Sequence, residues 1–372
     1  MKKVYLVFLV VVLAIFTAAC GDKASTSQQA DDKDKNKDQL VIRTTVYPLS
    51  YFAERIGGDF VDVSSIYPAG ANEHTFEPTQ KDMMKLADAD IFFYIGLGLE
   101  GFVENAKKTL ANEGVAMVAT ADQVTAEKLA ISTGHVHPED EEGHDHDAEA
   151  HEHEGHDHDA EAHDEHEGHN HDAEAHDEHV DHDHDAEADD HHDHEHGDID
   201  PHVWLSPTIS QDLALAIKNT LVEKMPAQET TFNANYEALV KELQDLDNDF
   251  KAMADQAQDK TFFVSHAAFG YIAGQYGLTQ VPIAGLNSQD EPSQKELTKI
   301  VDKANELHIH YILFEQNVSS KLAEVIQKEV GAESLVLHNL SVLTADDEKN
   351  NETYFTLMQE NIQTLEKALN TH

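Results

Sequence analysis

Three histidines lie apart from the histidine-rich part of this chain, at positions where a folded protein could use them as ligands. His74 is in GANEHTFEPT after a predicted strand, His202 is in DIDPHVWLSP before a predicted helix, and His266 ends the predicted strand TFFVSH. Neutral imidazole binds zinc, copper and nickel well. A single histidine is more often structural, but three at loops or strand ends, each near proline or glycine, favour a metal site.

A second group of possible ligands forms a low-complexity tract over residues 135–198. It holds 20 of the chain's 27 histidines, and its unit HDHDAEAH starts at residues 144 and 156, with a variant at 169. A segment with so few apolar residues cannot form a packed core, which predicts a disordered loop. We interpret the tract as metal-binding. The alternative is a solvated acidic spacer, to which histidines would add little charge or solubility.

The first 39 residues are typical of a targeting segment followed by a tether. Residues 1–20 combine two lysines, an apolar stretch too short for a comfortable membrane span, and small residues before Cys20, the only cysteine. Cys20 therefore suits lipid attachment after cleavage of a signal peptide. Thr17 departs from the leucine usual in lipoprotein signals, so ordinary cleavage and an uncleaved anchor are the alternatives. Residues 21–39 are polar and predict a flexible tether.

The formal net charge of the chain is −47, and its acidic character persists outside the tract. Nucleic-acid phosphates require a basic protein face, so this charge argues against a nucleic-acid partner. It suits an extracytoplasmic protein that attracts cations.

The remaining sequence alternates short apolar runs with amphipathic stretches. Residues 40–227 predict an N-terminal α/β lobe that contains the tract, and residues 260–372 predict a C-terminal α/β lobe. Between them, residues 228–259 have apolar side chains at steps of three and four and no Pro or Gly, which predicts a long linking helix. Strands that alternate with helices favour mostly parallel sheets. The predicted fold class is α/β, with two lobes joined by one long rigid helix.

Several short segments give the sequence a specific resemblance. GANEHTFEPT, DPHVWLSP, VSHAAFGY and FEQNVSSK resemble segments of the zinc-specific solute-binding proteins of bacterial ABC transporters, over about residues 40–369. An acidic histidine-rich insertion before DPHVWLSP is also typical of that family. The resemblance implies a metal in the cleft between the lobes, with His74 and His202 on the N-terminal lobe and His266 on the C-terminal lobe. It also implies zinc, because the manganese branch usually has a carboxylate where His266 stands.

The fourth ligand is where this chain departs from many relatives. They supply a carboxylate from a C-terminal loop that here reads LHNLSVLT, and Ser341 stands at about that place. Serine is a poor zinc ligand, so Glu73, directly before His74, is the predicted replacement. A water molecule and His338 are the alternatives. We expect Glu315, in FEQN, to brace the cleft through hydrogen bonds rather than to bind metal.

These features predict a monomeric, lipid-anchored protein outside the cytoplasm that captures Zn²⁺ and delivers it to the permease of an ABC transporter. Zinc hydrolases also use three histidines and a water, but the sequence has no HExxH motif, and we expect no enzymatic activity. A manganese or nickel carrier of the same fold, or a surface zinc buffer or adhesin that uses the tract, are the other candidates. His308 and His310 are predicted to be structural.

Overall fold

The computed structural model describes residues 39–134, 199–316 and 320–371, which belong to one compact unit. The predicted signal peptide with Cys20, the tether up to residue 38 and the histidine-rich tract lie outside the described residues. Within the described ranges, no helix has both the length and the apolar character needed to cross a membrane.

The N-terminal lobe is built on a parallel four-stranded sheet with the strand order β2-β1-β3-β4. Its central strand IFFY is buried at every position, as expected for a parallel sheet that is covered on both faces. The strands are β1 (Leu40–Thr44), β2 (Val61–Ser65), β3 (Ile91–Tyr94) and β4 (Ala116–Ala119). The helices are α3 (Tyr47–Gly57), α4 (Gln80–Ala87), α5 (Val103–Leu110), α6 (Ala126–Leu129) and α7 (Pro207–Lys224), with short 3-10 turns at Gly58–Phe60, Thr120–Gln123, Val203–Leu205 and Pro226–Gln228.

The C-terminal lobe repeats this plan with the parallel order β6-β5-β7-β8. Its strands are β5 (Thr261–His266), β6 (Thr279–Ala284), β7 (Tyr311–Phe314) and β8 (Glu333–Val336). Its helices are α9 (Gly270–Tyr276), α10 (Gln294–Glu306), α11 (Lys321–Val330), α12 (Ala345–Asn350) and α13 (Tyr354–Leu369). The predicted α/β class with two mostly parallel sheets is therefore confirmed.

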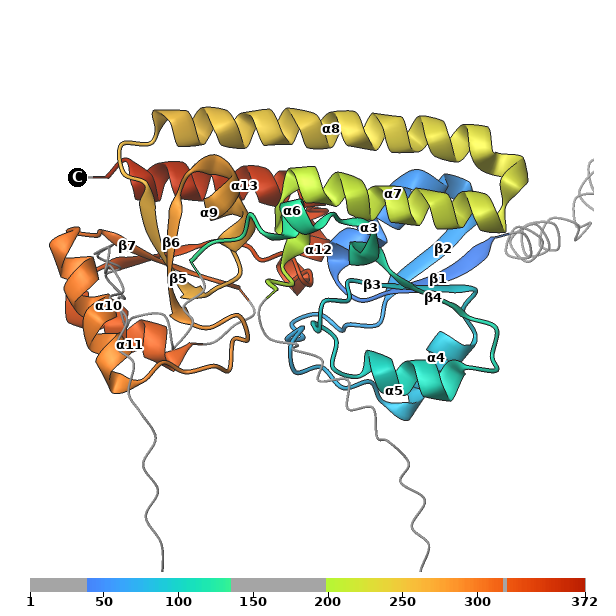
Figure 1. The fold of residues 1–372 in the computed structure, drawn as a ribbon, viewed down its shortest axis with the longest axis horizontal. Helices are drawn as coiled ribbons and strands as arrows, with labels where there is room; N and C mark the ends of the chain where they lie inside the picture. The colour runs from blue at the N-terminus through green and yellow to red at the C-terminus, as the bar shows by residue number, and fades with distance from the viewer. Residues whose placement is uncertain (1–38, 135–198, 317–319, 372) are drawn as a thin grey trace, which may run out of the picture. The chain divides into compact units, whose positions relative to one another are not determined.

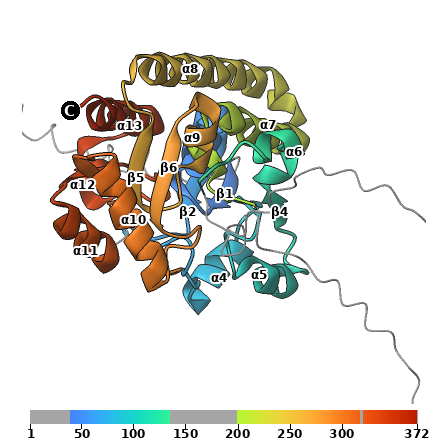
Figure 2. The same cartoon turned by 60° about the vertical axis from the view of Figure 1, so that its left-hand side comes forward.

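The second sheet has helices on both of its faces (Figure 2), and strand alternation sends its side chains to both helical layers. Phe263 and Ile312 pack in a small cluster with residues of α10 and α11. Phe262, Val264 and Leu313 belong instead to the large core, which also includes residues of α9 and α13. That large core continues into the N-terminal lobe, so the two lobes share one apolar interior.

The predicted long helix is α8 (Glu229–Gln256), which runs along both lobes (Figure 1). At about 1.5 Å per residue, its 28 residues span about 42 Å. It contacts α3 and α7 of the N-terminal lobe and α9 and α13 of the C-terminal lobe. Its buried stripe includes Phe232, Leu239, Leu243 and Phe250, at helical spacing. The prediction of one long helix joining the lobes is confirmed.

Segments on either side of residues 135–198 lie together against α9. Ser132 Oγ donates a 2.5 Å hydrogen bond to Asp200 Oδ2, and Tyr271 Oη donates to the backbone oxygen of Asp200. The backbone approaches α9 so closely that a Cβ atom at Gly274 would lie 1.8 Å from the carbonyl oxygen of Ile131. These contacts join the N-terminal lobe, the α9 helix and the residues just before His202.

Candidate metal centre

One group of side chains in the described part of the chain has the spacing of metal ligands. It consists of Glu73, His74, His202 and His266, whose ligand atoms all lie within 4.8 Å of one another. His202 Nε2 is 3.2 Å from His74 Nε2 and 3.2 Å from His266 Nε2. Glu73 Oε1 is 3.9 Å from His74 Nε2. The structure thus brings together all four residues predicted as metal ligands.

Each histidine reaches this point from a different part of the fold. His74 lies in the loop between β2 and α4, where Asn72 Oδ1 accepts a 2.9 Å hydrogen bond from the His74 backbone N–H. His202 directly precedes the 3-10 turn Val203–Leu205, and His266 is the last residue of β5. Sites on parallel sheets form at the carboxyl ends of strands, and two of these three positions follow that rule.

Two carboxylates fix the proton positions on the buried imidazoles. Asp200 Oδ1 lies 2.8 Å from His202 Nδ1, and Glu315 Oε1 lies 2.5 Å from His266 Nδ1. An ionised carboxylate only accepts hydrogen bonds, so each Nδ1 carries a proton, and the Nε2 of the neutral ring is the nitrogen available to a metal. The two Nε2 atoms face each other across 3.2 Å, a spacing that a shared metal ion, or a proton on one of the rings, accounts for.

The spacing fits a tetrahedral zinc ion. Zinc–nitrogen bonds of about 2.0–2.1 Å at tetrahedral angles place neighbouring ligand atoms about 3.3 Å apart. The two Nε2–Nε2 distances from His202, both 3.2 Å, match this value. The Glu73 oxygen lies farther out, at 3.9 Å from His74 Nε2.

The surroundings shift the pKa values of His74 and His266 in opposite directions. Burial, together with His202 and His266, lowers the pKa of His74 to about 2. Burial also lowers the pKa of His266, but the charge and hydrogen bond of Glu315, together with the charges of Glu73 and Asp200, outweigh this effect, and the net pKa is raised. Burial raises the pKa of Glu73, so the carboxylate is ionised less readily here than in water. A bound divalent cation would favour the ionised form of Glu73.

The loop expected to supply the fourth ligand in many relatives contacts Glu73 instead. Ser341 Oγ donates a 3.0 Å hydrogen bond to Glu73 Oε2, and Asn339 Nδ2 donates a 3.0 Å hydrogen bond to Glu73 Oε1. His338 lies outside the group of four, because its Nε2 pairs with Gln316 Nε2 at 2.6 Å. Ser341 is thus a hydrogen-bond donor beside the centre.

Glu315 makes the bracing contacts that we predicted, with Ser265 and Asn339 as well as with His266. Asp200 and Asn339 were missed by the sequence reasoning. Asp200 had a signal, since an acid two residues before a candidate histidine ligand can hydrogen-bond its ring. Asn339 had none, because its partners are distant in the sequence.

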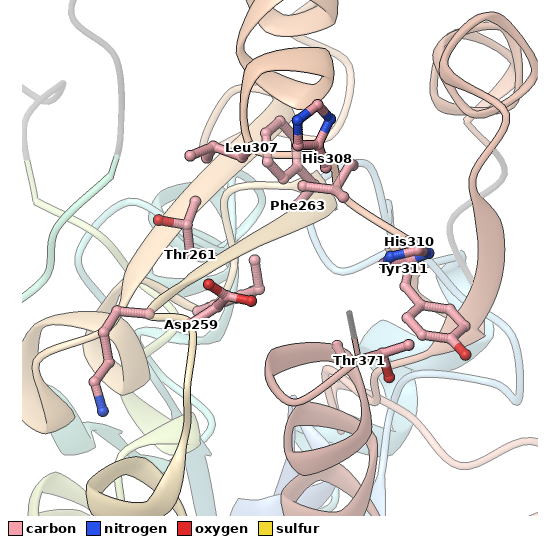
Figure 3. Close-up of a pocket in the computed structure, with 12 residues that line it drawn as sticks. Asp259, Thr261, Phe263, Leu307, His308, His310, Tyr311 and Thr371 are labelled. Carbon is pink, nitrogen blue, oxygen red and sulfur yellow. The ribbon is translucent and has the colours of Figure 1, made fainter.

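His308 and His310 lie at the other end of the second sheet. They line a small cavity with Thr261, the first residue of β5, whereas His266 is the last (Figure 3). At about 3.3 Å per residue, the strand separates the two ends by about 17 Å. Neither histidine can therefore join the candidate metal centre.

Comparisons with known proteins identify the family of this chain. Residues 42–368 match the family model described as zinc-uptake complex component A, periplasmic. The zinc-binding lipoprotein AdcA of Streptococcus pneumoniae is 33% identical over 369 residues, which cover 99% of this chain and 61% of that protein. The high-affinity zinc uptake system protein ZnuA of Bacillus subtilis is 32% identical over 362 residues, covering 97% of this chain and 96% of that protein. The chain therefore spans about three fifths of AdcA and nearly all of ZnuA.

Solved structures show the same likeness. The crystal structure of Zn(II)-bound AdcA from Streptococcus pneumoniae matches with a TM-score of 0.63 and 29% identity, over 90% of this chain and 58% of that one. The Zn(II)-bound ZnuA-like domain of the same protein matches with a TM-score of 0.63 and 28% identity, over 90% of this chain and all of that domain.

Proposed function

This chain belongs to the zinc-uptake complex component A family, and on that premise we propose that it captures Zn²⁺ outside the cytoplasm and delivers it to the permease of an ABC transporter. The observation that carries the proposal is the convergence of three imidazole Nε2 atoms, two of them with the proton held on Nδ1 by a carboxylate. In such a site the ligand rings are already oriented before the cation binds.

In this proposal, His74, His202 and His266 bind Zn²⁺ through Nε2, and Glu73 completes a tetrahedral site through one carboxylate oxygen. The distances from His202 Nε2 to the Nε2 atoms of His74 and His266 support this assignment. Three nitrogen ligands and one oxygen favour zinc over manganese, which prefers oxygen-rich, octahedral sites. Four protein ligands also leave no open position for a reacting water, which suits transport rather than hydrolysis.

The proposal places the protein at the membrane surface as a monomer. Cys20 would carry the lipid anchor, in line with the word lipoprotein in the name of the related AdcA. Residues 21–39 would then tether the folded unit to the membrane, close to the permease.

Equilibrium competition against a chromophoric chelator tests the proposal, with Zn²⁺, Mn²⁺ and Ni²⁺ titrated separately into the full chain. We expect one tight site that prefers zinc, and anomalous scattering from a zinc-soaked crystal should place the ion among the four side chains. A preference for Mn²⁺ or Ni²⁺, or a zinc peak elsewhere, would contradict the assignment. Uptake of ⁶⁵Zn by cells with and without the protein then tests delivery to the permease.

A further inference from the structure

A buried asparagine lies between two of the carboxylates that define the metal centre. Asn339 is 4% exposed, and its Nδ2 is 3.0 Å from Glu73 Oε1 and 2.8 Å from Glu315 Oε2. An amide nitrogen carries two N–H groups, so both hydrogen bonds form at once. Glu315 in turn hydrogen-bonds the ring of His266. One amide therefore contacts both the proposed ligand Glu73 and the carboxylate that orients the proposed ligand His266.

The orientation of this amide is fixed by its own oxygen. Asn339 Oδ1 accepts a 3.0 Å hydrogen bond from the Ser341 backbone N–H, which can only donate. The amide therefore cannot be turned over, and its NH₂ group must face Glu73 and Glu315. Leu340, between the two polar residues, has a φ of 57°, and its buried left-handed backbone lets the side chains of Asn339 and Ser341 both reach Glu73.

Asn339 is also linked to the third ligand segment. Its backbone oxygen accepts a 2.6 Å hydrogen bond from the indole N–H of Trp204, two residues after His202. The single residue therefore contacts Glu73 directly, reaches His266 through Glu315 and is linked to the His202 segment through Trp204. Among the described residues, the side chain of Asn339 hydrogen-bonds two carboxylates of the centre and otherwise only Ser341.

We propose that Asn339 is the positioning residue of the metal centre: it holds the Glu73 carboxylate in place for the metal while keeping Glu315 directed at His266. This inference rests on the proposed zinc-binding function. Glu73 and Glu315 repel each other when both are ionised. The amide between them donates to both, which keeps two carboxylates close together without a cation.

Ser341 assists at the second oxygen of Glu73. Its hydroxyl has one proton and lies 3.0 Å from both Glu73 Oε2 and Asn339 Oδ1, and the charged carboxylate is the stronger acceptor. The C-terminal loop thus contributes to the fourth ligand indirectly, through two donors that hold a carboxylate from the other lobe.

The test compares Asn339→Leu, which keeps the side-chain size but removes both donors, with Ser341→Ala and with the control Asn305→Leu on an exposed position of α10. Zinc affinity is measured by chelator competition, after unfolding curves have verified folding. We expect Asn339→Leu to weaken Zn²⁺ binding about 10- to 100-fold, the range typical of residues that orient metal ligands. Ser341→Ala should weaken it less, and the control should match the wild type.

Two readouts separate positioning from a general structural role. The visible d–d bands of bound Co²⁺ should change in Asn339→Leu, because the carboxylate ligand is displaced. In a Glu73→Ala background, Asn339→Leu should cause a clearly smaller loss of affinity, since one of its two targets is gone.

The outcomes distinguish the inference from the function on which it rests. A wild-type protein without a tight zinc site would overturn the proposed function and this inference with it. A wild type that binds zinc, with wild-type affinities and Co²⁺ spectra in both loop variants, would overturn the inference alone. Strictly additive losses for Asn339→Leu and Glu73→Ala would also overturn it. Should Asn339→Leu fail to fold, the result for Ser341→Ala decides.

Discussion

Replacing His74 with glutamine should make the metal-free protein less sensitive to acid. The side chain of His74 is only 6% exposed, and burial with two neighbouring imidazoles lowers its pKa to about 2. In the unfolded chain the same imidazole titrates near its ordinary pKa of 6.5. Below pH 6.5 the His74 imidazole therefore binds a proton in the unfolded chain but not in the folded chain. Folding becomes less favourable as the pH falls.

The size of the effect follows from how far the pH lies below the ordinary pKa of the imidazole. At pH 5 the solution is 1.5 pH units below the ordinary pKa of 6.5, and each unit corresponds to about 1.36 kcal/mol. His74 should thus remove about 2 kcal/mol from the free energy of unfolding between pH 8 and pH 5. The result hardly depends on the folded pKa, provided that it stays well below 5. The pKa of His266 is raised and acts in the opposite direction, but His266 is present in both proteins.

Urea unfolding in the presence of a chelator, at pH 8 and pH 5, measures the difference. The wild type should lose about 2 kcal/mol more of its free energy of unfolding than His74→Gln does over this range. His310→Gln, which removes an exposed imidazole at the start of β7, is the matched control and should lose as much as the wild type. If wild type and His74→Gln lost equal amounts, His74 would titrate normally in the folded protein, and the reasoning from burial would be refuted.

Three further predictions concern metal binding. His266→Ala should weaken zinc binding far more than His308→Ala or His310→Ala in chelator competition, because only His266 belongs to the group of four; equal affinities would contradict the site. Glu315→Gln should lower zinc affinity about 10- to 100-fold through the orientation of His266, and an unchanged affinity would show that the ring is held by packing alone. Deleting residues 135–196 should leave one tight zinc site in titration calorimetry and remove several weaker ones, and loss of the tight site would count against the assignment.

Much of the fold could be predicted from local sequence patterns. The run IFFY predicts a buried strand, and β3 is buried at every position. Ser206 and Pro207 predict a helix start, and the Ser206 hydroxyl accepts a hydrogen bond from the backbone N–H of Ile209. The uninterrupted apolar periodicity before residue 256 predicts α8. These signals are local, because side chains a few residues apart determine each of them.

The histidines of the centre were predictable for a related reason. His266 ends a strand, and the ends of parallel strands meet at one edge of the sheet, so its place could be inferred from its segment alone. The residues that hydrogen-bond the ligands were harder to predict from the sequence. Asn339 and Glu73 are 266 residues apart, and only the packing of the two lobes brings them together. Ser341 illustrates the same limit, because its contact with Glu73 carries no sequence signal.

The hydrogen bond between Ser132 and Asp200 has a consequence for how the chain can change over generations. Residues 132 and 200 are thus held together by contacts within the described part of the chain. An in-frame duplication or loss of one 12- or 13-residue unit would alter the number of histidines without moving either end. The same position should accept a foreign domain with adjacent termini, such as a fluorescent protein, inserted two residues from His202.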